Sequence, residues 1–264
     1  MLVDSHCHLD FPDFKEDMPL VMRRAEQGGI GIMQTICTKI SQFPDVLALT
    51  SRKDNLYCSI GIHPHNVEDE PEFRIEEVVK KIDANGKVIG VGETGLDYFY
   101  ENSPRELQRA SFVAHIDVAR KTGLPVIIHS READEDTIQI LEEETKKGPF
   151  PGLIHCFTGG RNLAKAALDC GLSISLSGII TFKNAAELRA VAREIPVERL
   201  LLETDSPFLA PIPCRGKRNE PSFLRHTADF VTKMLEIDIK LLEAQTTGNF
   251  HKLFTRVRGA EEQS

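Results

Sequence analysis

The sequence predicts an α/β fold of the TIM (β/α)8 barrel class, and three observations favour this fold. The chain has 264 residues, close to the roughly 250 residues of one such barrel. Eight short runs of apolar and β-branched residues alternate with helical patterns of ordinary length. No linker rich in Gly, Ser or Pro divides the chain. We therefore expect a single domain over residues 1–258 and a frayed, charged tail over residues 259–264.

The predicted strands are mostly unbroken apolar runs, which is typical of parallel strands in a sheet covered on both faces. In chain order they span Leu2–His8, Gly31–Cys37, Leu56–His63, Lys87–Glu93, Pro125–His129, Gly152–Cys156, Leu172–Leu176 and Arg199–Glu203. An open, doubly wound sheet is the alternative architecture. The absence of a Gly-x-Gly-x-x-Gly motif after the first strand makes that alternative less favourable.

The clearest predicted helix starts near Ser103. The segment Ser103–Glu106 predicts a capping box, with Pro104 at the first helical position. A core-facing stripe is predicted along this helix at Leu107, Ala110, Ala114 and Val118.

Composition and charge exclude several classes of function. A net charge of −8 and a pI near 5.6 argue against broad electrostatic capture of nucleic acid. No apolar run approaches the length of a membrane span, and no signal segment opens the chain. The six cysteines lie far apart without a Cys-x-x-Cys pair, which indicates reduced thiols. We expect a cytoplasmic protein without membrane association; the sequence leaves its oligomeric state open and is compatible with a monomer.

Histidines and carboxylates stand at or just beyond the ends of six predicted strands, where apolar runs stop. In a TIM barrel these ends meet at one rim. A buried ionisable group loses several kcal/mol of hydration unless it is paired or bound to a metal, so this convergence predicts a metal site. The residues are His6, His8, His63, Glu93, His129, His155 and Asp205.

Imidazoles and carboxylates without thiolates favour Zn, Mn, Fe or Mg in an open, catalytic geometry. We expect two divalent ions per chain, and the choice among Mg, Zn and Mn stays open. The first ion would be held by His6, His8, Glu93 and Asp205, and the second by Glu93, His129 and His155. A bridging Glu93 would set the ions roughly 3.5–4 Å apart, the spacing that suits phosphoester hydrolysis.

Other residues near these positions have two interpretations. His63 either faces substrate and the metal ligands or is only a polar strand end, and the sequence favours neither. By strand alternation, Cys7 and Cys156 are expected to point away from the site. Tyr98 and Phe99 either stack a base or simply cover the barrel mouth. Histidines within helical patterns are expected at the surface or satisfied: His115, His226 and His251.

Seven segments carry a family resemblance. They are Asp4–Asp10, Gly92–Asp97, His129–Arg131, His155–Gly159, Glu203–Pro207, Arg215–Pro221 and Thr246–Asn249. Together and in this order, they resemble the TatD family of metal-dependent hydrolases. The resemblance implies a TIM barrel with a divalent-metal centre and deoxyribonuclease activity, typically 3′→5′ exonucleolytic on single-stranded DNA. The six ligands named above match the family's metal and catalytic residues; Phe250 departs from it, standing where the family usually has a small residue.

The resemblance and the ligand set together suggest a mechanism. The metals would lower the pKa of a bound water toward about 7, and the resulting hydroxide would attack phosphorus in line. Glu93 and Asp205 are the expected catalytic residues, with Asp205 accepting the proton as general base. Phosphate contacts are expected from cations near the rim, Arg131, Arg215, Lys217 and Arg218, and substrate contact from His63.

Two other functions compete with the nuclease. One is hydrolysis of another ester or amide, such as that of a D-aminoacyl-tRNA. The other is a non-enzymatic barrel with a structural metal. A His/carboxylate ligand set at a barrel mouth disfavours the second, because structural sites usually close with Cys-rich tetrahedral ligands.

Overall fold

The computed structural model describes residues 1–71 and 73–257, and in these residues eight parallel strands form one sheet. The strands are β1 (Leu2–Cys7), β2 (Ile30–Thr35), β3 (Leu56–Ile60), β4 (Val88–Asp97), β5 (Val126–Arg131), β6 (Gly152–Ile154), β7 (Ser173–Leu176) and β8 (Leu200–Leu202). They are hydrogen-bonded in chain order, which confirms the predicted TIM barrel. The predicted frayed tail, residues 259–264, lies outside the described residues.

A short seam joins the last strand to the first. Cys7 pairs with Ser206 in an isolated parallel bridge. Beside it, the backbone N–H of Asp205 donates to the carbonyl of His6 at 2.9 Å, and that of His8 donates to the carbonyl of Ser206 at 2.8 Å. The seam therefore fixes the end of β1 against the segment that follows β8.

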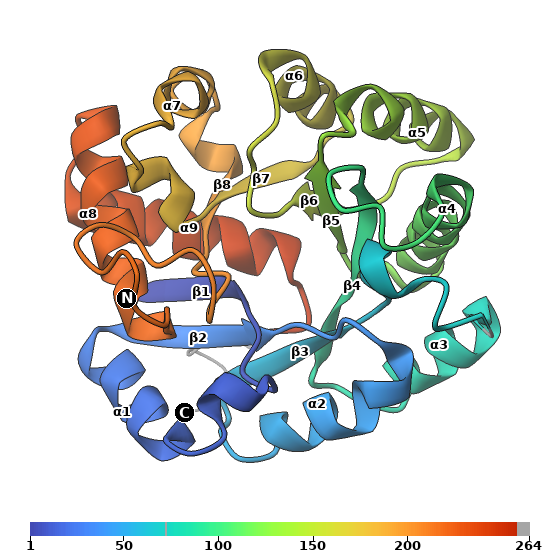
Figure 1. Cartoon of the computed structure of the whole chain (residues 1–264), viewed down its shortest axis with the longest axis horizontal. Helices are drawn as coiled ribbons and strands as arrows, with labels where there is room; N and C mark the ends of the chain where they lie inside the picture. Colours follow the sequence, from blue (N-terminus) through green and yellow to red (C-terminus); the bar gives the residue numbers. More distant parts are fainter. Residues whose placement is uncertain (72, 258–264) are drawn as a thin grey trace.

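Helices surround the sheet, and Figure 1 shows them as an outer ring. The α-helices are α1 (Met18–Gln27), α2 (Phe43–Thr50), α3 (Ile75–Asp83), α4 (Arg105–Thr122), α5 (Asp134–Lys147), α6 (Arg161–Asp169), α7 (Ala186–Ala192), α8 (Leu224–Leu235) and α9 (Ile239–Leu253). Short 3-10 helices span Pro12–Phe14, Ile40–Gln42, Pro64–Asn66, Gly178–Thr181, Val197–Arg199 and Pro221–Phe223.

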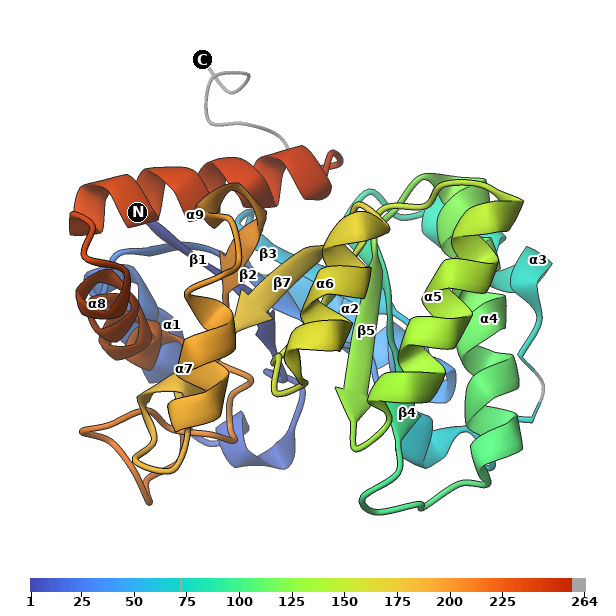
Figure 2. The same ribbon diagram turned by 90° about the horizontal axis from the view of Figure 1, so that it is seen from above.

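The apolar core has two layers. The larger layer lies between the sheet and the outer helices. The smaller one fills the barrel interior with Val3, Ile32, Tyr57, Ile89, Ile127, Leu153 and Leu201. Phe250 and Phe254 near the end of α9 join this interior cluster, and Figure 2 shows α9 lying across one end of the barrel. Helix α9 covers the end of the barrel where the strands begin. The pocket lies at the other end, where the strands stop.

Helix α4 corrects two details of the sequence analysis. The helix begins at Arg105, and its N-cap residue Pro104 makes no side-chain cap. Ser103 instead donates its hydroxyl to the carbonyl of His65, so the predicted capping box is wrong. The predicted stripe is right at Val118, which is buried, but wrong at Leu107, which is 43% exposed, and at Ala110, which is also exposed. The buried face comprises Gln108, Ser111, Phe112, His115, Ile116, Val118 and Ala119.

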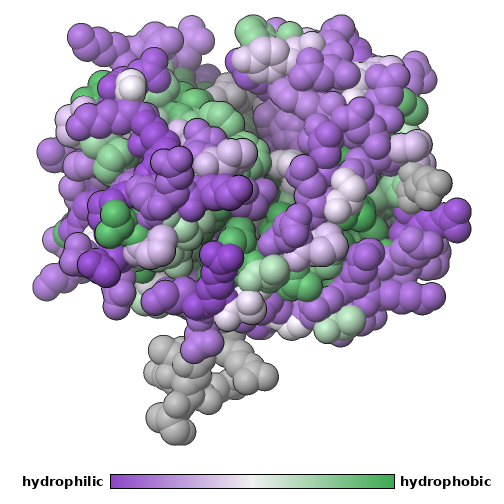
Figure 3. Space-filling model, turned by 60° about the horizontal axis from the view of Figure 1, so that its bottom comes forward, coloured by the Kyte–Doolittle hydropathy of each residue, from purple (hydrophilic) through white to green (hydrophobic). Residues whose placement is uncertain are grey.

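The surface offers no membrane-spanning helix among residues 1–71 and 73–257, since none there is both long and apolar enough to cross a bilayer. The face drawn in Figure 3 is mostly hydrophilic, and its hydrophobic side chains form separate patches.

Candidate metal centre

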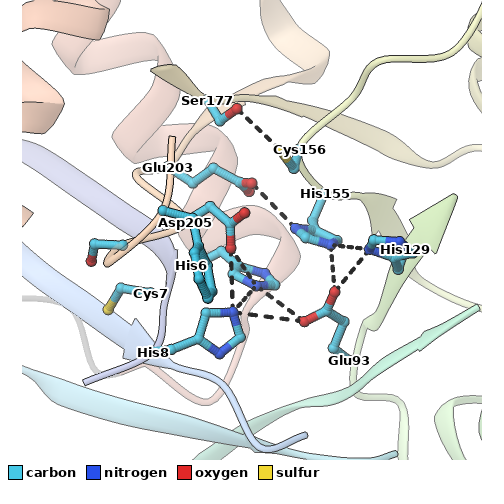
Figure 4. A network of polar contacts seen from close by, with 12 residues as sticks. His6, Cys7, His8, Glu93, His129, His155, Cys156, Ser177, Glu203 and Asp205 are labelled. Atoms are coloured by element: carbon cyan, nitrogen blue, oxygen red, sulfur yellow. Dashed lines mark hydrogen bonds and ion pairs between the residues drawn. The ribbon is translucent and has the colours of Figure 1, made fainter. Parts of the chain in front are cut away.

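Four predicted ligands meet at the barrel mouth (Figure 4): His6 in β1, His8 just after β1, Glu93 in β4 and Asp205 in the segment after β8. The Nε2 atom of His6 lies 3.3 Å from Nε2 of His8 and 3.3 Å from Oε2 of Glu93. Nε2 of His8 lies 3.2 Å from Oδ1 of Asp205. Ligand atoms about 2.0–2.1 Å from a tetrahedral ion are separated by about 3.3–3.4 Å, so these spacings fit one ion.

A second group shares Glu93 with the first. The Oε1 atom of Glu93 lies 2.7 Å from Nε2 of His155 and 3.1 Å from Nδ1 of His129. The two imidazole nitrogens are 3.3 Å apart. Glu93 therefore turns one oxygen toward each group, and the structure brings all six predicted ligands together.

Unsatisfied polar atoms show that these residues fit bound cations. Glu93 is 2% exposed, and within the described residues its Oε2 atom forms no hydrogen bond and has only the imidazoles of His6 and His8 beside it, at 3.3 and 3.9 Å. A buried carboxylate oxygen in that state costs several kcal/mol unless a cation meets it. Two groups of imidazole and carboxylate atoms joined by one carboxylate fit two divalent ions.

A third possible cluster, His6, His155 and Glu203, is less suitable for a metal. The rings of His6 and His155 stack with centroids 3.9 Å apart and an angle of 6° between their planes. An imidazole binds a metal through a lone pair in its ring plane. The lone pairs of two parallel, stacked rings do not converge on one point, so we assign no ion to this cluster.

Two buried carboxylates behind the second group fix its imidazole tautomers. Asp97 Oδ2 lies 3.0 Å from Nε2 of His129, so Nε2–H donates to it and Nδ1 is left free toward Glu93. Glu203 Oε1 lies 3.2 Å from Nδ1 of His155, which leaves Nε2 free toward Glu93. The two histidines therefore face the same point through different nitrogens.

The charges of the site are coupled. Burial alone would raise the pKa of Glu93, but the neighbouring imidazoles, His155 first among them, outweigh it and hold this pKa well below its usual value. Burial likewise opposes charge on His155, yet Glu93 and Glu203 raise its pKa well above the usual value. Without metal, His155 therefore holds an extra proton, and a cation that binds at this position must displace it.

His63 faces the second group with a defined tautomer. Its Nδ1 accepts a hydrogen bond from the backbone N–H of His65 at 3.1 Å, so a neutral His63 carries its proton on Nε2. That Nε2 lies 3.4 Å from Oε1 of Glu93. Burial lowers the pKa of His63 to about 3, which keeps the ring neutral. His63 therefore presents an N–H donor to the site and is not suited to be a ligand.

A pocket of about 820 Å³ opens above the two groups. His63 and Arg131 both line it, as the substrate-binding prediction requires. In contrast, the predicted phosphate contacts from Arg215, Lys217 and Arg218 are not among its lining residues.

The basic loop has other contacts instead. Arg218 pairs with Asp17, its Nη1 atom 2.8 Å from Oδ1, and the guanidinium of Arg215 lies over the Phe182 ring at 3.7 Å. The Arg218 cation is therefore already neutralised within the chain. Its prediction as a phosphate contact is not supported, because the Arg218 side chain lies against Asp17 beside α1 and does not line the pocket.

Sequence reasoning missed several residues of the site. Asp97 and Glu203 were not chosen, although each lies within four residues of a predicted ligand and strand alternation could have found them. Cys7 is buried as predicted, with its thiol near the Gln34 carbonyl. Cys156 is not a core residue, because it lines the pocket, but its thiol lies 3.1 Å from the Ser177 hydroxyl and points away from Glu93 (Figure 4). It follows β6 with φ +43°, which breaks the alternation of an extended strand.

Comparisons with known proteins agree with this geometry. Residues 3–255 match the family model described as TatD related DNase. The chain is 40% identical over 256 residues to YcfH of Escherichia coli K12, named an uncharacterized metal-dependent hydrolase, covering 96% of this chain and 95% of that protein. YabD of Bacillus subtilis, named likewise, is 36% identical over 254 residues, covering 96% and 99%.

A solved structure is similar over the same length. The crystal structure of the TatD homologue YjjV from Escherichia coli K12 superposes with a TM-score of 0.88 at 29% identity, covering 96% of this chain and 98% of that one. All six ligands, from His6 to Asp205, lie within residues 3–255, which match the family model. The chain therefore belongs to the TatD family of metal-dependent hydrolases.

Proposed function

We propose that this hydrolase cleaves phosphodiester bonds of single-stranded DNA as a 3′→5′ exonuclease. The observation that supports this most is the pair of ligand groups joined by Glu93, because a bridged pair of ions suits in-line displacement at phosphorus. The wall of the same pocket carries Arg131, whose guanidinium lies over the rings of Phe99 and Tyr100. Direction and preference for single strands rest on the family resemblance.

Divalent ions held by the six ligands would acidify a water molecule and offset negative charge on the phosphoryl oxygens. Asp205 is the residue best placed to accept the proton of that water. Its side chain is 14% exposed, against 2% for Glu93, so Asp205 reaches the pocket while Glu93 stays enclosed between the two groups. Arg131 and the Nε2–H of His63 stabilise the charge that develops on the phosphate.

The test is hydrolysis of end-labelled single-stranded DNA by protein stripped with a chelator and reloaded with Mg²⁺, Zn²⁺ or Mn²⁺ in turn. Reloading with one of these ions should restore a ladder of products shortened from the 3′ end. Glu93→Gln and Asp205→Asn should each reduce the rate more than about a hundredfold. Loss of a residue that only contacts a metal ligand typically costs 10–100-fold, and loss of a ligand itself should cost more. Glu194→Gln is the control, because Glu194 forms an exposed ion pair with Arg161.

Retention of near-normal rates by Glu93→Gln or Asp205→Asn would overturn these roles. Metal-loaded protein that leaves DNA intact but hydrolyses a D-aminoacyl-tRNA would replace the nuclease by the ester or amide hydrolase. Both substrates therefore belong in the same assay.

The free cysteines and the origin of the ligands support proposals for the cellular location and the oligomeric state. All six cysteines are free, and a reducing compartment keeps them so; we therefore propose a cytoplasmic location. One chain supplies every ligand of both groups, so a monomer could carry a complete site.

A further inference from the structure

Exposed aromatic rings gather at the pocket mouth. Phe99, Tyr100 and Phe208 are 50%, 55% and 51% exposed. Tyr100 and Phe208 line the same pocket as the metal ligands. Single exposed apolar residues are common on proteins, but rings that flank a polar pocket offer flat faces to a ligand.

The first aromatic wall stands beside the first ligand group. The ring of Phe208 lies 5.9 Å from that of Phe11 and 6.3 Å from that of His8, centroid to centroid. Phe11 in turn lies 4.7 Å from His8. The backbone N–H of Phe208 donates to the carbonyl of Asp205 at 3.0 Å, which ties this wall to a ligand.

The second wall stands beside the second ligand group. The Tyr100 ring lies 5.4 Å from that of His65, nearly perpendicular to it, and His65 lies 4.4 Å from His63. The guanidinium of Arg131 lies 4.8 Å from the centroid of the Tyr100 ring. Asp97 Oδ1 accepts the backbone N–H of Tyr100 at 3.0 Å, so the carboxylate that orients His129 also holds this wall.

We infer that Phe208 and Tyr100 stack the two nucleobases on either side of the scissile phosphate. The inference rests on the proposed function and adds the part of the substrate that is recognised. A phosphodiester placed at Glu93 extends one nucleoside past each ligand group, where one aromatic wall stands. A base can stack on a protein ring only when it is unpaired and splayed from its neighbours, so this arrangement selects single strands.

Tyr98, considered in the sequence analysis, has a different role. Its hydroxyl donates to Asp136 at 2.5 Å, and the guanidinium of Arg105 covers its ring at 4.1 Å. Phe99 is covered by Arg131 at 4.1 Å and, unlike Tyr100 and Phe208, is not among the residues that line the pocket. Tyr100 and Phe208 are therefore the rings assigned to the bases.

The test compares binding of two oligonucleotides to metal-loaded protein by fluorescence anisotropy. One is a short oligothymidylate with phosphorothioate linkages that resist cleavage, and the other has the same backbone without bases. Wild-type protein should bind the base-containing strand roughly tenfold to a hundredfold more tightly. Phe208→Leu and Tyr100→Leu, which keep apolar bulk but remove the flat face, should each lose most of that preference.

Leu241→Ala is the matched control, because Leu241 is 53% exposed on α9 at the closed end of the barrel. Equal binding of both strands by wild-type protein, or an unchanged preference in both leucine variants, would overturn the inference. Self-association that Phe208→Leu abolishes, with no preference for bases, would also overturn it and assign the ring to a contact between copies.

Cleavage of unmodified DNA separates this inference from the proposed function. Protein that prefers bases but cleaves no strand would contradict the nuclease and leave base stacking standing. Protein that cleaves DNA without any preference for bases would support the nuclease and contradict base stacking.

Discussion

A single carboxylate, Asp97, decides which nitrogen of His129 can meet a metal. Its Oδ2 accepts from Nε2 of His129 and from Nε2 of His65, at 3.0 and 2.9 Å. Its Oδ1 accepts the backbone N–H groups of Phe99 and Tyr100. Because those two donors need an oxygen, an amide placed at this position would have to turn its NH₂ group toward the imidazoles.

Asp97→Asn should therefore invert the His129 tautomer. The amide would donate to Nε2, the imidazole proton would move to Nδ1, and Nδ1 could no longer bind a cation. We expect affinity for the second ion to fall by about 10–100-fold while the first ion binds as before. Calorimetric titration of stripped protein with Zn²⁺ measures both sites.

Asp136→Asn serves as the control, because Asp136 contacts Tyr98 and Arg109 but no ligand. Two unchanged binding events in Asp97→Asn would show that Asp97 is only a structural residue.

The ligands could be predicted because each is a polar residue at the end of an apolar strand. Strand alternation could place Asp97 and Glu203 beside the ligands but could not show their role, since that role depends on which imidazole nitrogen each contacts. The position of Arg218 depends on how the loop after β8 folds. Its partner Asp17 is 201 residues away in the chain, and no local pattern announces such a pair.

Strand β4 has little room where it passes β5. Gly95 has a φ of +131°, and a Cβ atom there would lie 2.0 Å from the backbone oxygen of His129. The neighbouring atom belongs to backbone and cannot turn aside. This close approach holds β4 and β5 together at the point where both supply ligands.

Gly95→Ala should lower the free energy of unfolding by about 2–3 kcal/mol, because the new methyl group forces the strands apart and strains the backbone. Gly248→Ala in α9 is the opposite case: its Cβ meets nothing within 4 Å, and we expect a gain of about 0.5–1 kcal/mol from helix propensity. Urea titration of both variants gives the two values. A Gly95→Ala variant as stable as wild type would mean that β4 can move away from β5 at little cost.

The sequence predicted the positions of the strands more reliably than it predicted which side of a helix is buried. Apolar runs long enough for a strand predicted all eight strands, but of the predicted stripe on α4 only Val118 is buried. Gln108, which is fully buried, accepts the backbone N–H of Asp97 at 2.8 Å and donates to the Ser103 carbonyl at the same distance. A helix that forms hydrogen bonds with backbone groups at the end of a strand buries polar side chains. A pattern of hydrophobic residues does not predict such a buried face.

At the scale of the whole molecule, the barrel order followed from the alternation of strands and helices, because right-handed parallel connections leave few other arrangements. The alternation does not show how the last strand joins the first to close the barrel. That closure depends on contacts between distant segments, such as Asp4 accepting the Thr204 hydroxyl at 2.6 Å across the seam. The stability of the barrel therefore includes buried polar groups that the sequence pattern leaves unassigned.

His115 makes that stability depend on pH. It is fully buried on α4, where Nδ1–H donates to the Ser111 carbonyl at 2.7 Å and Nε2 accepts the N–H of Ile62 at 3.1 Å. The Phe73 ring covers it at 4.4 Å. Burial lowers the pKa of His115 to about 4, from an ordinary value of 6.5.

Between pH 6.5 and 4 the unfolded chain binds a proton at His115 that the folded chain does not, so stability must fall as the pH falls. Over that interval wild type should lose about 3 kcal/mol more than His115→Gln, which cannot titrate. Urea unfolding of both proteins at several pH values measures the difference, and the protons of the metal ligands cancel because both proteins carry them. Parallel pH profiles for the two proteins would show that His115 is charged in the folded barrel or that the site opens to water.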